Sequence, residues 1–147
     1  MTFFVIALVA IDQVVKYFVS INLRLNNEVT IVSNLLYITY IENRGAAFGL
    51  FQNQRYFFII FATIMIMIFF YFIKYKKIKD KIFLTSALLI IAGGIGNIID
   101  RVIYGYVIDY IRLSFFPAVC NFADYCITLG TIGLIFYVLF RSKNARN

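Results

Sequence analysis

Long uncharged apolar runs alternate along the chain with short polar segments. Two runs, at 56–73 and 82–99, contain no charged residue, and each is 18 residues long. An 18-residue helix is about 27 Å long, which is close to the thickness of the hydrocarbon core of a bilayer. Two further apolar stretches extend over roughly 3–23 and 122–140 and contain few charges. The pattern therefore predicts four transmembrane helices.

The composition supports an integral membrane protein. Of 147 residues, 63% are hydrophobic, 19% are aromatic and only 14% are charged. One soluble core of this size cannot cover so much apolar surface. A cleaved signal peptide is an alternative for the first stretch. However, that stretch has neither a basic start nor a small-x-small cleavage site, and Asp12 and Lys16 interrupt its apolar region. We therefore expect it to span the membrane.

Basic residues cluster beside two of the predicted spans. The connection "KYKKIKDK" at 74–81 holds five lysines, and the tail "RSKNARN" at 141–147 holds three more basic residues. Lys and Arg beside spans mark the cytoplasmic side, so we expect both termini in the cytoplasm and the segments 24–55 and 100–121 at the outer face. These clusters hold eight of the fourteen basic residues behind the net charge of +7, which argues against a nucleic-acid-binding surface.

The first outer segment differs from the spans because β-branched and aromatic residues alternate roughly with polar ones before Asn43, Gly45 and Gly49. This pattern is typical of strands followed by turns. We expect a small sheet whose edges are shielded by the membrane surface or by the helix ends. The predicted fold is an all-α membrane protein with four transmembrane helices and a small extracellular sheet, and we expect 1–147 to form a single domain.

The inventory of reactive side chains is short. The chain has no His, and its two cysteines are Cys120 and Cys126. A Ser-His-Asp or Cys-His site is therefore impossible, and a zinc site without imidazole would be unusual. A disulfide would close a very short loop, so we expect two small buried hydrophobic side chains instead. A serine nucleophile with a lysine base stays open, with Lys16 as the only lysine outside the cytoplasmic clusters.

Four of the seven acids lie within or at the outer ends of the predicted spans, where ionisable groups are costly. Asp12 and Lys16 are four residues apart on one helical face, so we interpret them as a neutralising pair that holds the first span to its neighbours. Asn97 and Arg101 share a face in the same way, beside Asp100. We interpret this second group as mainly structural, although Arg101 is also placed to contact a substrate.

Asp109 and Asp124 have no basic partner at helical spacing, and apolar and aromatic residues surround them in "YVIDYI" and "NFADYC". Arg112 is close to Asp109 in sequence, but in an extended segment it points to the opposite face. Asn121 lies one turn before Asp124 and is placed to orient it. If the two acids meet, they can share one proton and hold a water molecule for attack on a carbonyl. Two separately solvated loop acids are the alternative.

Four motifs occur in an order that resembles one enzyme family. They are "DQVVK" at 12–16, "ENRGAAFGLF" at 42–51, "GGIGNIIDRVIYGYVIDYI" at 93–111 and "FPAVCNFADYCIT" at 116–128. Together they resemble the motif set of the lipoprotein signal peptidase family, also called signal peptidase II, over nearly the whole chain. The G-N-x-x-D-R and N-x-A-D elements make this resemblance specific.

The resemblance implies a bacterial four-helix membrane aspartic endopeptidase that removes signal peptides from prolipoproteins, just before a cysteine that carries diacylglycerol. It implies no cofactor and no nucleic acid, and a small extracellular β-cradle. We expect a monomer in the bacterial inner membrane, in contact with lipid, with its site at the outer face. The resemblance maps the catalytic dyad onto Asp109 and Asp124. It places Asn43, Gly45, Asn97, Arg101 and Asn121 around the substrate site, and Asp12, Lys16 and Asp100 in a structural polar group.

The chain departs from the family pattern around Asp124. The segment "PAVCNFADY" has one extra residue and carries Cys120 and Tyr125 in place of the usual Phe and Ser. We expect altered packing there, and a short loop after Asp109 that covers substrate with fewer residues. Two rival functions are a protease with a G-x-G-D motif, which would need an acid where Asn97 stands, and a proton or ion carrier, which would need carboxylates along the whole path across the bilayer.

Overall fold

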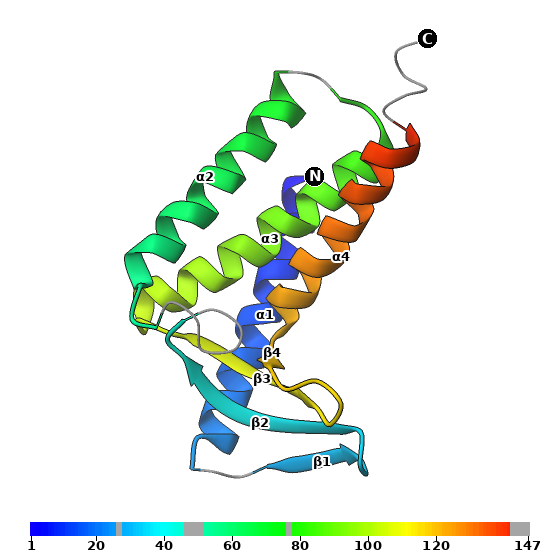
Figure 1. Ribbon diagram of the computed structural model, residues 1–147. Coiled ribbons are helices and arrows are strands. Elements are labelled where there is room, and N and C mark those ends of the chain that lie inside the picture. The colour runs from blue at the N-terminus through cyan, green and yellow to red at the C-terminus, as the bar shows by residue number, and fades with distance from the viewer. Residues whose placement is uncertain (26–27, 46–51, 76–77, 142–147) are drawn as a thin grey trace.

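The computed structural model describes residues 1–25, 28–45, 52–75 and 78–141, in which a group of long helices stands on a small sheet (Figure 1). The elements in chain order are α1 (Thr2–Leu23), β1 (Val29–Val32), β2 (Leu36–Asn43), α2 (Arg55–Lys74), α3 (Lys81–Ile103), β3 (Val107–Leu113), β4 (Val119–Cys120) and α4 (Phe122–Phe136), which a π-helical turn, η2 (Tyr137–Arg141), continues.

The four expected spans are confirmed as helices long and apolar enough to cross a membrane: α1, α2, α3 and Phe122–Phe140. Their outward faces are apolar, and only 6% of the most apolar part of α2 is buried inside the protein. Large exposed side chains such as Phe57, Phe61 and Phe70 occupy those faces. Because a bilayer is as apolar as these side chains, their exposure fits a protein surrounded by lipid.

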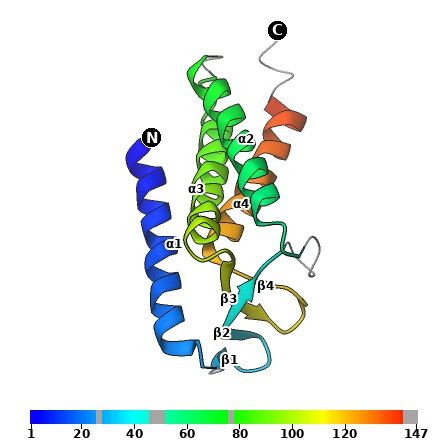
Figure 2. The same ribbon diagram turned by 90° about the vertical axis from the view of Figure 1, so that its left-hand side faces the viewer.

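The helix α3 is the centre of the bundle and packs against α1, α2 and α4. Figure 2 shows α1 on one side of α3, and α2 and α4 on the other. Glycines permit these close contacts: a Cβ added at Gly96 would lie 2.6 Å from an Asp12 carboxylate oxygen, and one at Gly130 of α4 would lie 2.6 Å from the Ser86 carbonyl oxygen. Small residues at such crossings let helix backbones approach one another.

The third helix extends four residues past the end expected at 99, so Asp100 and Arg101 belong to α3 and not to a loop. A search for uncharged runs stops at the first charge, but a helix continues where a charge is neutralised, and Asp100 forms an ion pair with Lys16. The helix ends at Ile103, and Gly105 just beyond it has a φ of 86°, in the left-handed region that glycine adopts readily.

The sheet has four antiparallel strands in the order β1-β2-β3-β4. The expectation of a sheet in the first outer segment is confirmed for β1 and β2, while the second outer segment supplies β3 and β4, which the sequence pattern did not predict. The end of α1 covers the sheet: Val19 and Leu23 pack with Tyr106, Ile108 and Tyr110 in one apolar cluster. Strand β3 is thus central and largely buried.

The two ends of the molecule differ in charge and structure. The N-terminus, the end of α2, the start of α3 and the end of η2 all lie at the end opposite the sheet (Figure 1). Lys74 closes α2 and Lys81 opens α3 at that end. The sheet and the adjoining ends of α1 and α3 occupy the other end, where β3 leads directly into the polar region described next.

Candidate active site

The carboxylate of Asp109 lies in the middle of the central strand β3, opposite Ile41 of β2. Only 2% of the residue is exposed. Its Oδ2 accepts a hydrogen bond of 2.7 Å from the side-chain amide of Asn43, and its Oδ1 accepts one of 2.6 Å from that of Asn121. Two amide donors therefore hold this acid in place in an apolar strand.

Asp124 lies in the first turn of α4, where Asn121 is the N-cap. The Asn121 side chain accepts a hydrogen bond from the Asp124 backbone N–H at 2.9 Å, and Asp124 Oδ2 accepts one from the Asn121 N–H at 3.1 Å. This reciprocal pair is a capping box. Asp124 Oδ1 also accepts a 2.8 Å hydrogen bond from Asn97 of α3. Asn121 thus contacts Asp124 through two hydrogen bonds.

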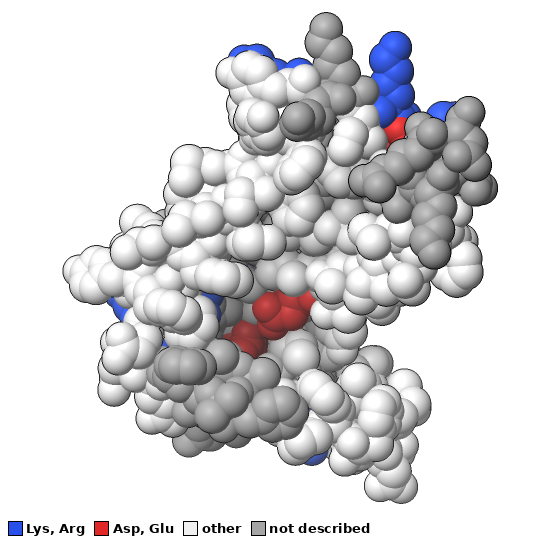
Figure 3. All heavy atoms as spheres, turned by 45° about the horizontal axis from the view of Figure 1, so that its top comes forward, with Lys and Arg blue, Asp and Glu red and all other residues white. Residues whose placement is uncertain are grey.

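Asn121 also joins the two acids. Its side-chain amide N–H donates to Asp109. Its side-chain oxygen and its backbone N–H form the capping box with Asp124. Both acids line one cavity of about 280 Å³. Figure 3 shows acidic side chains at the bottom of a hollow in a largely uncharged surface. The structure thus brings Asp109 and Asp124 to one site, as expected of a pair and not of two separate loop acids.

The surroundings of Asp109 make it hold its proton more strongly. Burial, followed by the charge of Asp124, raises the pKa of Asp109 to about 7, against the lowering effects of Asn43, Asn121 and Lys16. A carboxyl group that binds a proton near neutral pH, next to a second carboxyl group, can exchange protons with a reacting molecule. The pair therefore has the chemistry of general acid and base catalysis.

The other residues expected around the site also line this cavity: Asn43, Gly45, Asn97 and Arg101. The Arg101 guanidinium donates to the Gly45 carbonyl at 3.1 Å and lies 4.7 Å from the centre of the Phe58 ring. Arg101 is thereby fixed between α3, the end of the β2 segment and α2. The remainder of the "ENRGAAFGLF" motif, 46–51, lies outside the described residues.

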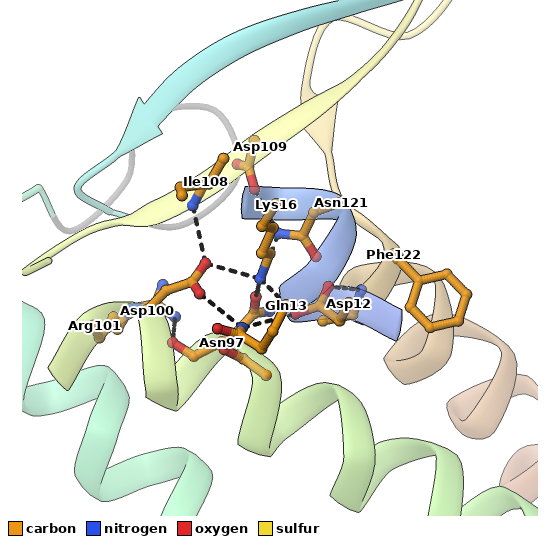
Figure 4. Close-up of polar contacts among 12 residues, drawn as sticks. Asp12, Gln13, Lys16, Asn97, Asp100, Arg101, Ile108, Asp109, Asn121 and Phe122 are labelled. Atoms are coloured by element: carbon orange, nitrogen blue, oxygen red, sulfur yellow. Dashed lines mark hydrogen bonds and ion pairs between the residues drawn. The ribbon is translucent and has the colours of Figure 1, made fainter. Parts of the chain in front are cut away.

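A polar layer formed by Asp12, Gln13, Lys16 and Asp100 lies behind the cavity, and its three charged residues are buried (Figure 4). Lys16 Nζ is 2.9 Å from Asp12 Oδ2 and 2.8 Å from Asp100 Oδ2, so the expected Asp12–Lys16 pair is confirmed and includes a third charge. Sequence reasoning missed Gln13, whose amide donates to Asp100, Asp12 and the Gly96 carbonyl. A polar residue next to Asp12 in an apolar run was the signal that would have identified it.

The two cysteines are free, as expected. Cys120 lines the cavity, but burial, followed by the charges of Asp124 and Asp109, raises the pKa of its thiol to about 11. A thiol with so high a pKa is a poor nucleophile at neutral pH. Arg112 points away from the site, as expected, and makes two 2.7 Å hydrogen bonds to Glu28. Neither group competes with the acid pair.

An apolar groove of about 400 Å³ between α2, α3 and α4 adjoins the polar cavity. Its walls include Phe61, Met65 and Ile127, and it shares Asn97 and Arg101 with the cavity that holds the acids. A molecule with an apolar part and a peptide part can therefore occupy both spaces at once.

Comparison with known proteins agrees with this geometry. The family described as "Signal peptidase (SPase) II" matches residues 4–140. The lipoprotein signal peptidase of Streptococcus thermophilus (strain CNRZ 1066) is 41% identical over 95% of this chain and 92% of its own length, and that of Clostridioides difficile (strain 630) is 40% identical over 97% and 96%. A bacterial membrane enzyme solved by the in meso method at 2.3 Å resolution superposes with a TM-score of 0.90, at 30% identity, over 97% of this chain and 89% of that one. With its four apolar helices and this match over nearly its full length, the chain belongs to the signal peptidase II family.

Proposed function

We propose that this protein is a membrane aspartic endopeptidase that cleaves the signal peptide from diacylglyceryl-modified prolipoproteins, just before the lipidated cysteine, with Asp109 and Asp124 as its catalytic pair. The observation that carries the proposal is the joining of these two acids by Asn121 in one cavity. Family membership supports the reaction, and the absence of His from the chain excludes an imidazole as the acid or base.

The pair supplies both halves of the acid-base chemistry. Its ionised member takes a proton from a water molecule while the water oxygen attacks the scissile carbonyl, and its protonated member donates a proton to the carbonyl oxygen. The first acid then gives its proton to the leaving nitrogen as the C–N bond breaks, and the carbonyl oxygen returns its proton to the second. Asn43, Asn97 and Asn121 keep the two carboxyl groups in position through these steps.

The apolar groove supports a lipidated substrate. A helix is about 10–12 Å across, so one helical turn alone would fill about 400 Å³. The groove has about this volume and is lined mainly by apolar side chains, so it suits an acyl chain better than a signal-peptide helix of several turns. We therefore assign the groove to the diacylglyceryl group, whose binding energy would place the peptide bond beside the acids.

The topology that we propose puts the sheet and the acid pair at the outer face of the membrane and both termini in the cytoplasm. The lysines that end α2 and begin α3, at the end opposite the sheet, support it. Reporter fusions at 77 and at the C-terminus should read cytoplasmic and one near 26 external. These fusion points lie outside the described residues. An external reading at 77 would reverse the placement of every acid.

A cleavage assay tests the proposed function. Purified protein in detergent or lipid is offered a diacylated prolipoprotein and, separately, its unlipidated form. Cleavage of the first form only is the expected result, and cleavage of neither would refute the proposal. Because all of the site residues named above belong to one chain, we also propose that a monomer suffices, which crosslinking or size measurement during the same assay can check.

A further inference from the structure

Two of the buried acids behind the cavity contact the backbone directly beside the two proposed catalytic acids. Asp100 Oδ2 accepts a 3.1 Å hydrogen bond from the N–H of Ile108, the residue before Asp109. Asp12 Oδ1 accepts a 3.0 Å hydrogen bond from the N–H of Ala123, the residue before Asp124. Each structural carboxylate therefore holds the residue that precedes one member of the pair.

Lys16 connects these two contacts. Its ammonium group lies 2.9 Å from Asp12 and 2.8 Å from Asp100, and only 1% of the residue is exposed. The same ammonium group donates a 3.1 Å hydrogen bond to Asn97, whose amide in turn donates to Asp124. Figure 4 shows Lys16 at the centre of these contacts, between α1, α3 and the strand that carries Ile108.

We propose that Lys16 is a positioning residue that sets the separation of Asp109 and Asp124 through Asp100 and Asp12, the two carboxylates that it binds. The proposal rests on the catalytic role assigned above to Asp109 and Asp124. It goes beyond a neutralising role for the Asp12–Lys16 pair, which would need only one carboxylate and no contact with the residues before the catalytic acids.

The geometry of the two backbone contacts explains why they can act on position. In β3, side chains point to the two faces of the sheet, whereas backbone N–H groups lie roughly in its plane. A hydrogen bond to the Ile108 N–H therefore fixes the strand without occupying the face to which Asp109 points. In α4, the Ala123 N–H belongs to the first turn, whose N–H groups have no partner within the helix. Asp12 of α1 supplies that partner and so ties α4 to α1 at the turn that carries Asp124.

The balance of charge explains why one lysine serves both contacts. Two buried carboxylates repel each other, and leaving either without a cation would be costly in a bundle surrounded by lipid. The single ammonium group of Lys16 neutralises one charge and holds both carboxylates in fixed orientations. Asp12 then accepts its backbone hydrogen bond through Oδ1, the oxygen that Lys16 does not contact, whereas Asp100 accepts its own through Oδ2, the oxygen that also contacts Lys16. Loss of the ammonium group should free both carboxylates and let β3 and α4 move independently.

The test is Lys16→Met, which keeps the length of the side chain and removes its charge. We expect kcat to fall about 10- to 100-fold, the range seen when a supporting group behind a reactive site is lost, while KM for the diacylated prolipoprotein stays within about twofold. Val19→Ala is the control, because Val19 is a buried residue of the same helix that packs in the apolar cluster against the sheet. It should lower thermal stability and leave kcat unchanged.

A second variant guards against a folding failure of Lys16→Met. The double variant Lys16→Met with Asp100→Asn removes one cation and one anion, so the net charge of the layer is unchanged and only the connection is lost. It should show the same loss of kcat at unchanged KM. A folded variant of either kind with a kcat within about twofold of the unmodified protein would overturn the inference. So would an equal loss of kcat in Val19→Ala, or the failure of both variants to show a cooperative unfolding transition.

The unmodified protein, measured alongside, separates this inference from the proposed function. If it does not cleave the diacylated substrate, the proposed function is wrong and the positioning role falls with it. If it cleaves that substrate and Lys16→Met cleaves it equally fast, the function stands and only the positioning role is refuted.

Discussion

Replacing Asp109 with Asn is the sharpest test of the acid pair, because an amide keeps the volume of the side chain and cannot exchange a proton. General acid-base catalysis is worth about 10²- to 10⁴-fold in rate, or about 3 to 5 kcal/mol in the activation barrier. Since the pair must both activate water and protonate the carbonyl, we expect a loss in the upper part of that range for Asp109→Asn and for Asp124→Asn. The double variant should be scarcely slower than either single one, because members of one catalytic unit are not additive.

The structure also gives the cost of the same change to stability. Both oxygens of Asp109 accept hydrogen bonds from amide groups, one from Asn43 and one from Asn121. An asparagine offers only one acceptor oxygen, so one buried amide loses its partner, at a cost of about 1–3 kcal/mol in unfolding free energy. Asn43→Ala separates the two effects, because it removes one of these hydrogen bonds and leaves the carboxyl group of Asp109 in place.

The assay is single-turnover cleavage of a diacylated prolipoprotein with enzyme in excess, at equal amounts of folded protein. Asp80→Asn is the matched control: the Asp80 carboxylate caps α3 at the far end of the bundle by accepting the N–H groups of Ile82 and Phe83. Asparagine caps helices as well as aspartate does, so this variant should cleave normally. If Asp109→Asn turns over within a few fold of the unmodified protein, the aspartic mechanism is wrong.

Three further outcomes are expected. Burial and then the charge of Asp124 raise the pKa of Asp109 to about 7, so the shared proton is held below that pH and lost above it. Single-turnover cleavage should therefore slow as pH rises through about 7. A rate that keeps rising there would contradict this role of the proton. Cys120→Ser and Cys126→Ser should both retain cleavage, with at most a packing loss measurable as a lower melting temperature; loss of turnover in a folded variant would point to thiol chemistry. Ala62→Phe should partly fill the apolar groove and raise KM for the diacylated substrate. The same exchange at Ala10, on the exposed side of α1, should leave KM unchanged. Equal effects at both positions would argue against the groove as the acyl site.

Local features were readable from the sequence because they depend on spacing along one element. The spans follow from the length of apolar runs, and the Asp12–Lys16 pair follows from the four-residue period of a helix face. The Asn121–Asp124 capping box depends in the same way on a three-residue spacing at a helix start. The ion pair and the capping box each form within one helical turn, and each span is one continuous helix, so no knowledge of the tertiary fold is needed to predict them.

The contacts that complete the site were not readable in this way, because they join distant segments. Asn43 and Asp109 are 66 residues apart and meet only because β2 pairs with β3. That pairing was missed because β3 is central and buried, so it lacks the alternation of polar and apolar residues that marks a strand with one solvated face. Without a helical or alternating period, the periodicity of "VIDYIRL" did not identify it as a strand.

The placement of the buried charges also has a consequence for how the protein inserts into the membrane during synthesis. During synthesis α1 leaves the ribosome well before α3, which carries Asp100, and it must enter the bilayer with Asp12 and Lys16 inside it. Because these two residues pair with each other across one turn, the helix can insert with its charges already neutralised. Asp100 lies near the last turn of α3 and can stay in contact with water until the helices dock. The charged layer is then completed only when the bundle assembles, so an incomplete chain in the membrane would hold no formed active site.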